Sequence, residues 1–146
     1  MSVIYREEDD TYYERQKVGN QTIELGMNFY DQNLHDRKAY FNVYITIFNK
    51  RKDMYSNMDK KAITGTNPIA NALTAREMFK RVEQYLLAKE FDYWDEITIF
   101  CTWVNNRRRD AYYKVLSRWG YDWGIIGGQK CIMRTFKWNE EKECYE

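Results

Sequence analysis

This chain of 146 residues has little of several features that would narrow its function at once. It has one proline, Pro68, and seven glycines, so no linker rich in either residue divides it. Its one histidine, His35, lies in a polar stretch, which argues against catalytic triads and histidine metal sites. The three cysteines follow no metal or disulfide spacing, so we expect a reducing, cytoplasmic setting and no bound metal.

Long apolar runs and a dominant charge are also missing. No stretch approaches membrane-spanning length, and the opening residues, MSVIYREEDD, do not resemble a secretory signal, so we expect no membrane association. The 23 basic and 22 acidic residues give a net charge of +1. Because the whole chain has no large positive field to hold a duplex, we do not expect nucleic acid as a partner.

Aromatic residues are what the chain has in excess. They make up 17% of it, and 13 residues are tyrosine. Such an excess indicates either a recognition surface or a tyrosine-rich core and sheet, and we favour the core and sheet because aromatics fit pleated, half-buried surfaces. The length suits one domain with a real hydrophobic core.

Alternation of apolar and polar residues predicts strands in both halves of the chain. The predicted strands are residues 11–18, 22–30, 39–49 and 96–104 and the two arms of a hairpin over residues 121–136. Gly19-Asn20 and Gly127-Gly128 are the expected two-residue turns, since such turns need positive φ angles. The strongest pattern is that of residues 39–49, whose alternate positions are apolar on one face and amphipathic on the other.

Two helices are expected between these strands. Residues 74–90 carry an apolar stripe at helical spacing, and Thr74 with Glu77 forms a capping-box pattern at their start. Residues 105–120 begin at a cap, Asn105 or Asn106, and end at Gly120, which suits the left-handed residue after a helix. The apolar stripe is typical of core packing.

The order of these elements predicts the fold class. The helix over residues 74–90 links the strand 39–49 to the strand 96–104, so the two strands should be parallel neighbours. We predict a single α+β domain over residues 1–146, with a mixed, mostly antiparallel sheet, one parallel strand pair and two main helices. Residues 50–71 form a long basic segment whose order the sequence leaves open, and residues 137–146 read as a frayed acidic tail.

The stretch 95–136 reads as a strand, a helix ending in Trp-Gly-Tyr, and a hairpin turning at Gly-Gly. This pattern resembles the C-terminal half of the GCN5-related N-acetyltransferase family. The resemblance implies that acetyl-CoA binds where the parallel strands part, its pantetheine along the backbone near Ile45, Ile47 and Asn49. It also implies pyrophosphate contacts at Gly65 and Thr66, in a loop that keeps one glycine of the family pattern.

The same resemblance implies further site residues. Asn105 and Asn106 would contact the cofactor, Glu96 would deprotonate an amine acceptor, and Tyr113 would protonate the departing thiolate. The chain departs from the family in two places: Leu116 stands where the acid tyrosine usually lies, and the 38 residues before the strand 39–49 are mostly strand-like, so the acceptor side is remodelled.

Two functions from different classes follow. In the first, the chain is a divergent acetyltransferase that transfers an acetyl group from acetyl-CoA to an amine acceptor. In the second, it is a catalytically silent binding or structural protein with a protein partner, such as a phage-encoded factor or virion component. Whether the chain is an enzyme is left open by the residues, because the glycine loop and the acid position both depart from the family pattern.

Arg107, Arg108 and Arg109 open the second predicted helix. Cations at a helix N-terminus oppose the helix dipole, so the cluster costs stability unless an anion lies nearby. A coenzyme phosphate, a nucleic-acid backbone, an acidic partner or an internal carboxylate would each supply one, and a solvated helix face is the alternative. We predict that at least one of the three arginines meets an anion.

Overall fold

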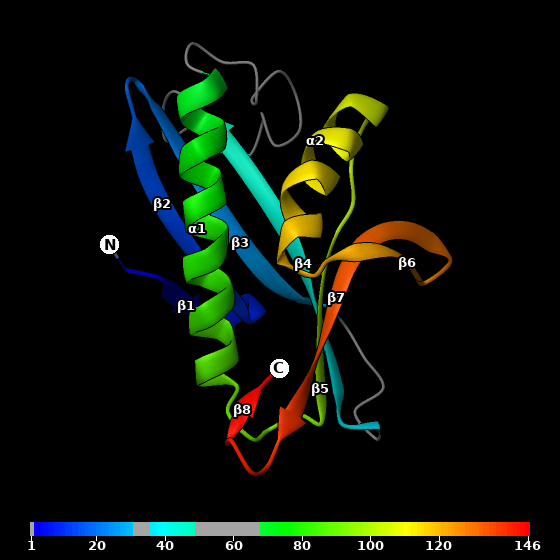
Figure 1. Cartoon of the computed structure of the whole chain (residues 1–146). Coiled ribbons are helices and arrows are strands. Elements are labelled where there is room, and N and C mark those ends of the chain that lie inside the picture. The colour runs from blue at the N-terminus through cyan, green and yellow to red at the C-terminus, as the bar shows by residue number, and fades with distance from the viewer. Residues whose placement is uncertain (1, 31–35, 49–67) are drawn as a thin grey trace. The chain divides into compact units, whose positions relative to one another are not determined.

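The computed structural model describes residues 2–30, 36–48 and 68–146 (Figure 1). The strands are β1 (Ile4–Arg6), β2 (Thr11–Val18), β3 (Gln21–Tyr30), β4 (Lys38–Phe48), β5 (Glu96–Cys101), β6 (Asp122–Ile126), β7 (Gln129–Asn139) and β8 (Cys144–Tyr145). The helices are α1 (Pro68–Lys89) and α2 (Asn106–Leu116), and the short 3-10 turns are η1 (Glu7–Asp9) and η5 (Ser117–Trp119). The chain divides into two compact units, Met1–Asn28 with Tyr44–Leu86 and Phe29–Val43 with Leu87–Glu146.

In the first unit, β1, β2, β3 and β4 are hydrogen-bonded in that order, and β1, β2 and β3 are antiparallel neighbours. The predicted turn is confirmed, because Gly19 has a φ of 60° and joins β2 to β3. Helix α1 covers one face of these strands: Arg81 pairs with Glu14, and the ring of Tyr85 lies 5.9 Å from that of Tyr12.

In the second unit, the strand order is β4, β5, β7 and β6, with β8 pairing to β7. The pair β4 and β5 is parallel, from Lys38↔Glu96 to Asn42↔Phe100, whereas β5, β6 and β8 each pair with β7 antiparallel. The predicted fold class is therefore confirmed: α+β, with a mixed sheet, one parallel strand pair and two main helices.

The helices differ from prediction mainly at their starts. Helix α1 begins at Pro68, so the capping box predicted at Thr74 is wrong and that residue lies inside the helix. Proline suits a first helical turn because its missing N–H would have no partner there. The predicted stripe is confirmed, since Met78, Phe79, Val82 and Leu86 are all buried.

The second helix follows its prediction closely. The Asn105 side chain caps α2 by accepting a hydrogen bond from the Arg108 N–H, and Gly120 adopts the left-handed conformation with a φ of 84°. Gly127 and Gly128 turn the β6–β7 hairpin with φ values of 59° and 80°, as predicted.

The C-terminal segment is ordered, so the predicted frayed tail is wrong. Strand β7 continues to Asn139, and β8 brings Tyr145 back against the ring of Trp138 at 5.1 Å. The Tyr145 hydroxyl accepts from the Trp94 N–H at 3.0 Å and lies 2.8 Å from the carbonyl oxygens of Glu90 and Trp94. Trp138 and Tyr145 thus hold this segment in place by packing. Its many charged residues had led to the prediction of a frayed tail.

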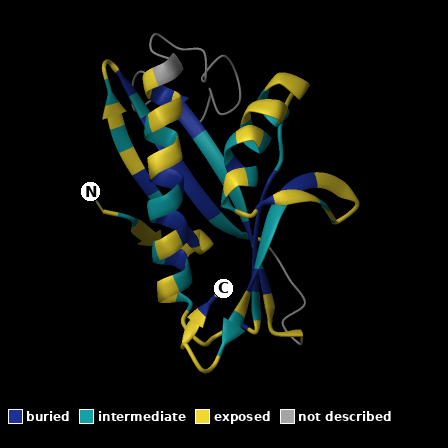
Figure 2. Cartoon of the chain, in the orientation of Figure 1, coloured by how far each residue is buried: buried dark blue, intermediate teal, exposed yellow. Residues whose placement is uncertain are grey.

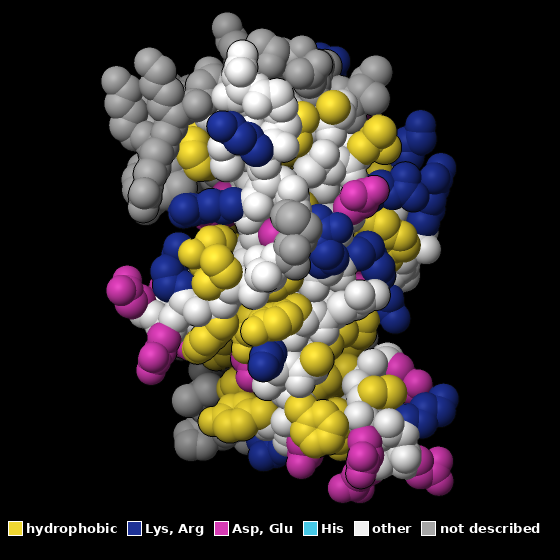
Figure 3. Space-filling view, turned by 90° about the vertical axis from the view of Figure 1, so that its left-hand side faces the viewer, with side chains coloured by type: hydrophobic (Ala, Val, Ile, Leu, Met, Phe, Trp, Pro, Cys, Tyr) yellow, Lys and Arg dark blue, Asp and Glu magenta, His cyan; other side chains and the backbone are white. Residues whose placement is uncertain are grey.

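Buried residues run along the central strands of each unit (Figure 2). Hydrophobic side chains also remain exposed between charged ones on the face that Figure 3 shows. Of the two helices in the described part of the chain, neither is long and apolar enough to cross a membrane.

Candidate functional site

The residues predicted to hold a coenzyme fall only partly within the described chain. Ile45 and Ile47 lie on β4, and Ile47 is buried. Asn49, Gly65 and Thr66 lie outside the described residues, as does His35, so the predicted phosphate loop remains a prediction.

The parallel ladder in the second unit ends at an unusual residue. Its last pair is Asn42↔Phe100, although β4 itself continues to Phe48. The Asn42 side-chain oxygen Oδ1 is buried and has no hydrogen-bond partner in the described chain. A buried acceptor without a partner costs free energy, about 1–3 kcal/mol. An N–H donor that reached this oxygen would remove that cost.

Asn105 and Asn106 lie at the start of α2, after the end of β5. The Asn105 oxygen accepts from the Arg108 N–H at 2.9 Å, so this side chain serves the helix cap. Asn106 is exposed at the first helical position and keeps its predicted role only as a proposal.

The arginine cluster meets an internal carboxylate, which confirms the prediction that at least one of the three contacts an anion. Arg109 Nε lies 2.9 Å from Asp110 Oδ1. Both side chains are substantially exposed, so solvent screens this ion pair and its contribution to stability is small.

Tyr113, the predicted general acid, is held by two contacts. Its hydroxyl donates to Asp122 Oδ1 at 3.2 Å, and its ring stacks on Trp123 with centroids 4.3 Å apart and planes 7° apart. Desolvation and then the nearby Asp122 carboxylate raise the pKa of Tyr113 above its ordinary value. The proton that a thiolate would need is thus shared with a neighbouring carboxylate.

Glu96, the predicted general base, lies elsewhere in the same unit. It pairs with Lys38 on β4 and with Lys137 on β7, whereas Asp122 pairs with Met133 of β7 from the opposite side. Met133 and Lys137 are separated by about 13 Å along β7, at roughly 3.3 Å per residue. The predicted base and Asp122, the partner of the predicted acid, therefore lie at separate positions along β7.

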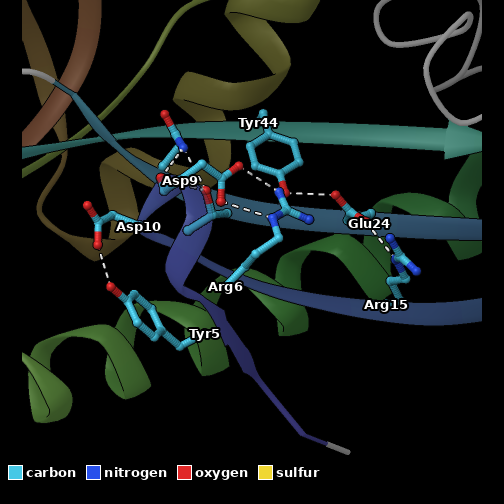
Figure 4. Close-up of polar contacts among 9 residues, drawn as sticks. Tyr5, Arg6, Asp9, Asp10, Arg15, Glu24 and Tyr44 are labelled. Carbon is cyan, nitrogen blue, oxygen red and sulfur yellow. Dashed lines mark hydrogen bonds and ion pairs between the residues drawn. The ribbon is translucent and has the colours of Figure 1, made fainter.

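A polar network in the first unit was missed by the sequence analysis (Figure 4). The Tyr44 hydroxyl donates to Glu24 Oε2 at 2.7 Å, and Arg15 Nε donates to Glu24 Oε1 at 2.6 Å. Glu24 is buried, and the Tyr44 ring lies over Gly26, where an added Cβ would be 2.5 Å from the ring. Burial, followed by the Glu24 charge, raises the pKa of Tyr44 above its ordinary value.

The same network extends to η1 through a second arginine. Arg6 contacts both oxygens of Asp9 at 2.9 Å, which raises the pKa of the Arg6 guanidinium. Arg6 and Arg15 lie 5.0 and 5.4 Å from the centroid of the Tyr13 ring. Each cation of the network already has a carboxylate partner, so the network reads as structure. The sequence does contain one signal for this network, because Arg15 and Glu24 lie on the two strands of a predicted hairpin. It does not show that Tyr44 lies next to Glu24.

The described residues include three free cysteines, of which Cys101 and Cys131 are buried and Cys144 is exposed. No group of three or more histidine, cysteine, aspartate or glutamate side chains in the described part of the chain is placed to hold a metal ion. Burial raises the pKa of Cys101 to about 12 and also raises that of Cys131, so neither thiol is an activated nucleophile.

Comparison with known proteins gives one structural likeness. No protein-family model matches the chain, and no curated protein matches it in sequence. A search of solved structures finds the N-terminal domain of ribosomal-protein-alanine acetyltransferase from Clostridium acetobutylicum ATCC 824, with 11% identity and a TM-score of 0.39. The match covers 92% of this chain and 95% of that chain.

Proposed function

We propose that this chain is an acyl-CoA-binding protein with an acetyltransferase-like sheet and without acetyl-transfer activity. The observation that carries the proposal is the buried, unpartnered Oδ1 atom of Asn42 at the end of the β4–β5 ladder. A parallel pair that stops while one strand continues leaves backbone groups of β4 for a ligand, and Asn42 adds a side-chain acceptor beside them.

The coenzyme's chemistry fits this acceptor. The pantetheine arm of coenzyme A carries amide N–H groups, which donate where Asn42 accepts, and the bound thioester supplies the acyl group. The resemblance predicts further contacts at Ile45, Ile47, Asn49, Gly65, Thr66 and Asn106, and these remain predictions. No N–H donor of the chain satisfies Asn42 in the described residues, so an external donor gains the full benefit.

The proposed lack of transfer rests on the predicted acid and base. General acid–base catalysis needs both groups within hydrogen-bond reach of the reacting atoms. The Tyr113 hydroxyl donates a hydrogen bond to Asp122, whereas Glu96 lies across β7 from Asp122 and further along the sheet. We therefore propose that Tyr113 and Glu96 do not act together on one amine and one thioester.

A second candidate, an active N-acetyltransferase, is favoured by one observation. The Tyr113 hydroxyl is protonated at neutral pH, because the ordinary tyrosine pKa is 10.0 and desolvation, followed by Asp122, raises the pKa of Tyr113 further, and a general acid for a departing thiolate must carry a proton. In this candidate the substrates are an acyl-CoA and an amine acceptor, and Asp122 must release Tyr113 during the reaction.

Calorimetry with acetyl-CoA tests the binding proposal. Asn42→Leu removes the acceptor at similar volume and should weaken binding about fivefold to tenfold, the worth of one neutral hydrogen bond. The matched control is Asn139→Leu, on the β7–β8 hairpin, which should bind like the parent. Acetyl-CoA at about a hundred times its Kd should stabilise the chain by roughly 2.7 kcal/mol. Absence of heat and of any shift in Tm at millimolar acetyl-CoA would contradict the proposal.

An assay for released thiol, with a panel of amines, separates the two candidates. We expect no thiol release above the uncatalysed background. Release that falls sharply in Tyr113→Phe or Glu96→Gln, while acetyl-CoA still binds, would instead establish the acetyltransferase.

A further inference from the structure

Three aromatic side chains cluster at the surface of the second unit, where Trp123 is exposed and Trp103 and Tyr113 are half-buried. Tyr113 stacks on Trp123, and Trp103, between β5 and α2, meets Trp123 edge-on with centroids 5.8 Å apart and planes 84° apart. Trp123 is 48% exposed, and two apolar residues near platform residues in sequence, Val104 after Trp103 and Ile125 after Trp123, are 55% and 68% exposed. We call Trp103, Tyr113 and Trp123 the aromatic platform. Single exposed apolar residues are ordinary on a protein surface, whereas a contiguous exposed apolar patch indicates an interaction site.

The chain around the platform is strongly basic, although the whole chain is nearly neutral. Residues 106–134 contain seven basic residues: Arg107, Arg108, Arg109, Lys114, Arg118, Lys130 and Arg134. The same segment contains two acidic residues, Asp110 and Asp122, so its net charge is +5 within a chain of net charge +1. The near-zero charge of the chain therefore conceals a positive segment that carries the aromatic rings.

Two of these cations, Arg109 and Lys130, lie on the helix and the hairpin that carry two of the rings, whereas Arg134 donates to the Trp119 carbonyl at 2.7 Å and lies 4.3 Å from the centroid of the Phe136 ring. Arg109 precedes Tyr113 by one turn on the same side of α2, and Lys130 pairs with Ile125 across the β6–β7 hairpin. Asp122 is occupied, because it accepts from the Tyr113 hydroxyl and from the Trp123 N–H at 2.8 Å. Asp110 is paired with Arg109.

We propose that the aromatic platform binds single-stranded nucleic acid. Bases stack on the tryptophan rings, and the basic residues of the segment hold the phosphates, the two components of a sequence-tolerant single-strand site. The positive charge also argues against a second copy of the chain at this place, because two such surfaces would repel each other. The sequence-based expectation of no nucleic-acid partner concerned the charge of the whole chain, whereas this surface depends on its local distribution.

Anisotropy of a labelled oligothymidylate about 12 nucleotides long, within the usual range of site sizes, measures the binding. Trp123→Ala should weaken it roughly tenfold, since each stacked base is worth a factor of this order. Arg107→Gln combined with Lys130→Gln should reduce the slope of log K against log salt by about 0.7 for each phosphate that these side chains no longer neutralise. Tyr93→Ala removes an aromatic that is 64% exposed elsewhere in the same unit and should leave binding unchanged.

Folding of each variant is checked by circular dichroism, and Trp103→Ala replaces Trp123→Ala if the latter unfolds. Binding that is absent at low salt, or equal in the platform and control variants, overturns the proposal. Three further results also overturn it: displacement of the oligonucleotide by acetyl-CoA, a dimer in sedimentation that Trp123→Ala dissociates, and binding to anionic vesicles without binding to the oligonucleotide. Failure of acetyl-CoA to bind would leave this proposal intact, because the coenzyme contacts proposed above, with Asn42 first among them, include none of the three platform residues.

Discussion

The two units use polar and aromatic side chains in opposite ways. In the first unit, Glu14 is fully buried and pairs with Arg81, and the buried Glu24 is held by Tyr44 and Arg15. In the second unit, Tyr113 and Trp123 stack at the surface. A cluster of charged residues is therefore not by itself a functional site. Where every charge has a partner the cluster holds the fold, and where rings and cations remain exposed it is available to a ligand.

The largest expected effect comes from breaking the buried ion pair of the first unit. Arg81 donates to both Glu14 oxygens, at 2.8 Å from Nη2 and 3.0 Å from Nε, and Glu14 is 0% exposed. Arg81→Met leaves that carboxylate buried without its cation. We expect a loss of about 2–4 kcal/mol in the free energy of unfolding, below the upper end for a fully buried pair because solvent reaches Arg81.

Urea denaturation measures this loss. The double variant Glu14→Leu with Arg81→Met should recover at least half of it, because no charge is then left buried alone. If the single and double variants unfold at the same urea concentration, the pair does not hold the first unit together.

Two glycines sharpen the comparison, one in each unit. A Cβ at Gly26 would lie 2.5 Å from ring atoms of Tyr44, whereas a Cβ at Gly124 would collide with the flexible side chain of Met133. Gly26→Ala should therefore cost about 1–3 kcal/mol, the usual range for overpacking, because the Tyr44 ring must leave Glu24. Gly124→Ala should cost clearly less, since methionine adapts its shape. Thermal unfolding of the two variants side by side checks the order, and a reversed order would mean that Tyr44 is not fixed by its network.

Tyr44→Phe tests the network through pH. The folded-state pKa of Tyr44 is raised above its ordinary value of 10.0, so the folded chain holds this proton more tightly than the unfolded chain. The associated stability is present below about pH 10 and is lost as the pH rises beyond it. At neutral pH the variant should lose about 1 kcal/mol for the missing hydrogen bond.

Above pH 10 the parent should lose stability faster than Tyr44→Phe, and urea titrations at several alkaline pH values measure the two slopes. The variant keeps some slope, because Tyr112 and Tyr145 also have raised pKa values. Equal slopes in parent and variant would show that Tyr44 and Glu24 do not interact in solution.

The smallest effect is expected at the start of α2. Replacing Arg107, Arg108 and Arg109 together by Gln removes three cations from a helix N-terminus and one exposed ion pair. The free energy of unfolding should rise by a few tenths to about 1 kcal/mol, while oligonucleotide binding should fall. If the triple variant is less stable than the parent, these arginines stabilise the fold, as the paired arginines of the first unit do.

Much of the fold could be predicted from sequence because the signals were local. Alternation indicated the strands, and the helix between residues 39–49 and 96–104 indicated the parallel pair, since only a crossover can join parallel neighbours. Gly19, Gly120 and Gly127 marked turns because their positive φ angles suit glycine. Helix starts were less predictable: Pro68 lies in a segment without strong periodicity.

The site residues were less predictable because they depend on which strands are neighbours. The bond from Tyr44 to Glu24 joins residues 20 apart in sequence, and alternation places each on a face without naming its neighbour. The separation of Glu96 from Tyr113 likewise follows from the position of β7 between β5 and β6. The aromatic platform was not predicted, because in the sequence Trp123 is simply an aromatic residue of a predicted hairpin strand. Its stacking on Tyr113 is visible only in the structure.

The hydroxyl of Tyr145 has a consequence for how the second unit opens locally. It accepts a hydrogen bond from the Trp94 N–H and lies within hydrogen-bond distance of the Glu90 carbonyl oxygen. The turn between α1 and β5 is therefore stabilised by a residue more than fifty positions later in the sequence. The Trp94 amide should exchange with deuterated water only when β8 lifts away from β7. The exchange rate of this one amide would therefore measure how often the last strand detaches from β7. Slow exchange would mean that β8 opens only with the rest of the sheet, and fast exchange would mean that β8 opens by itself.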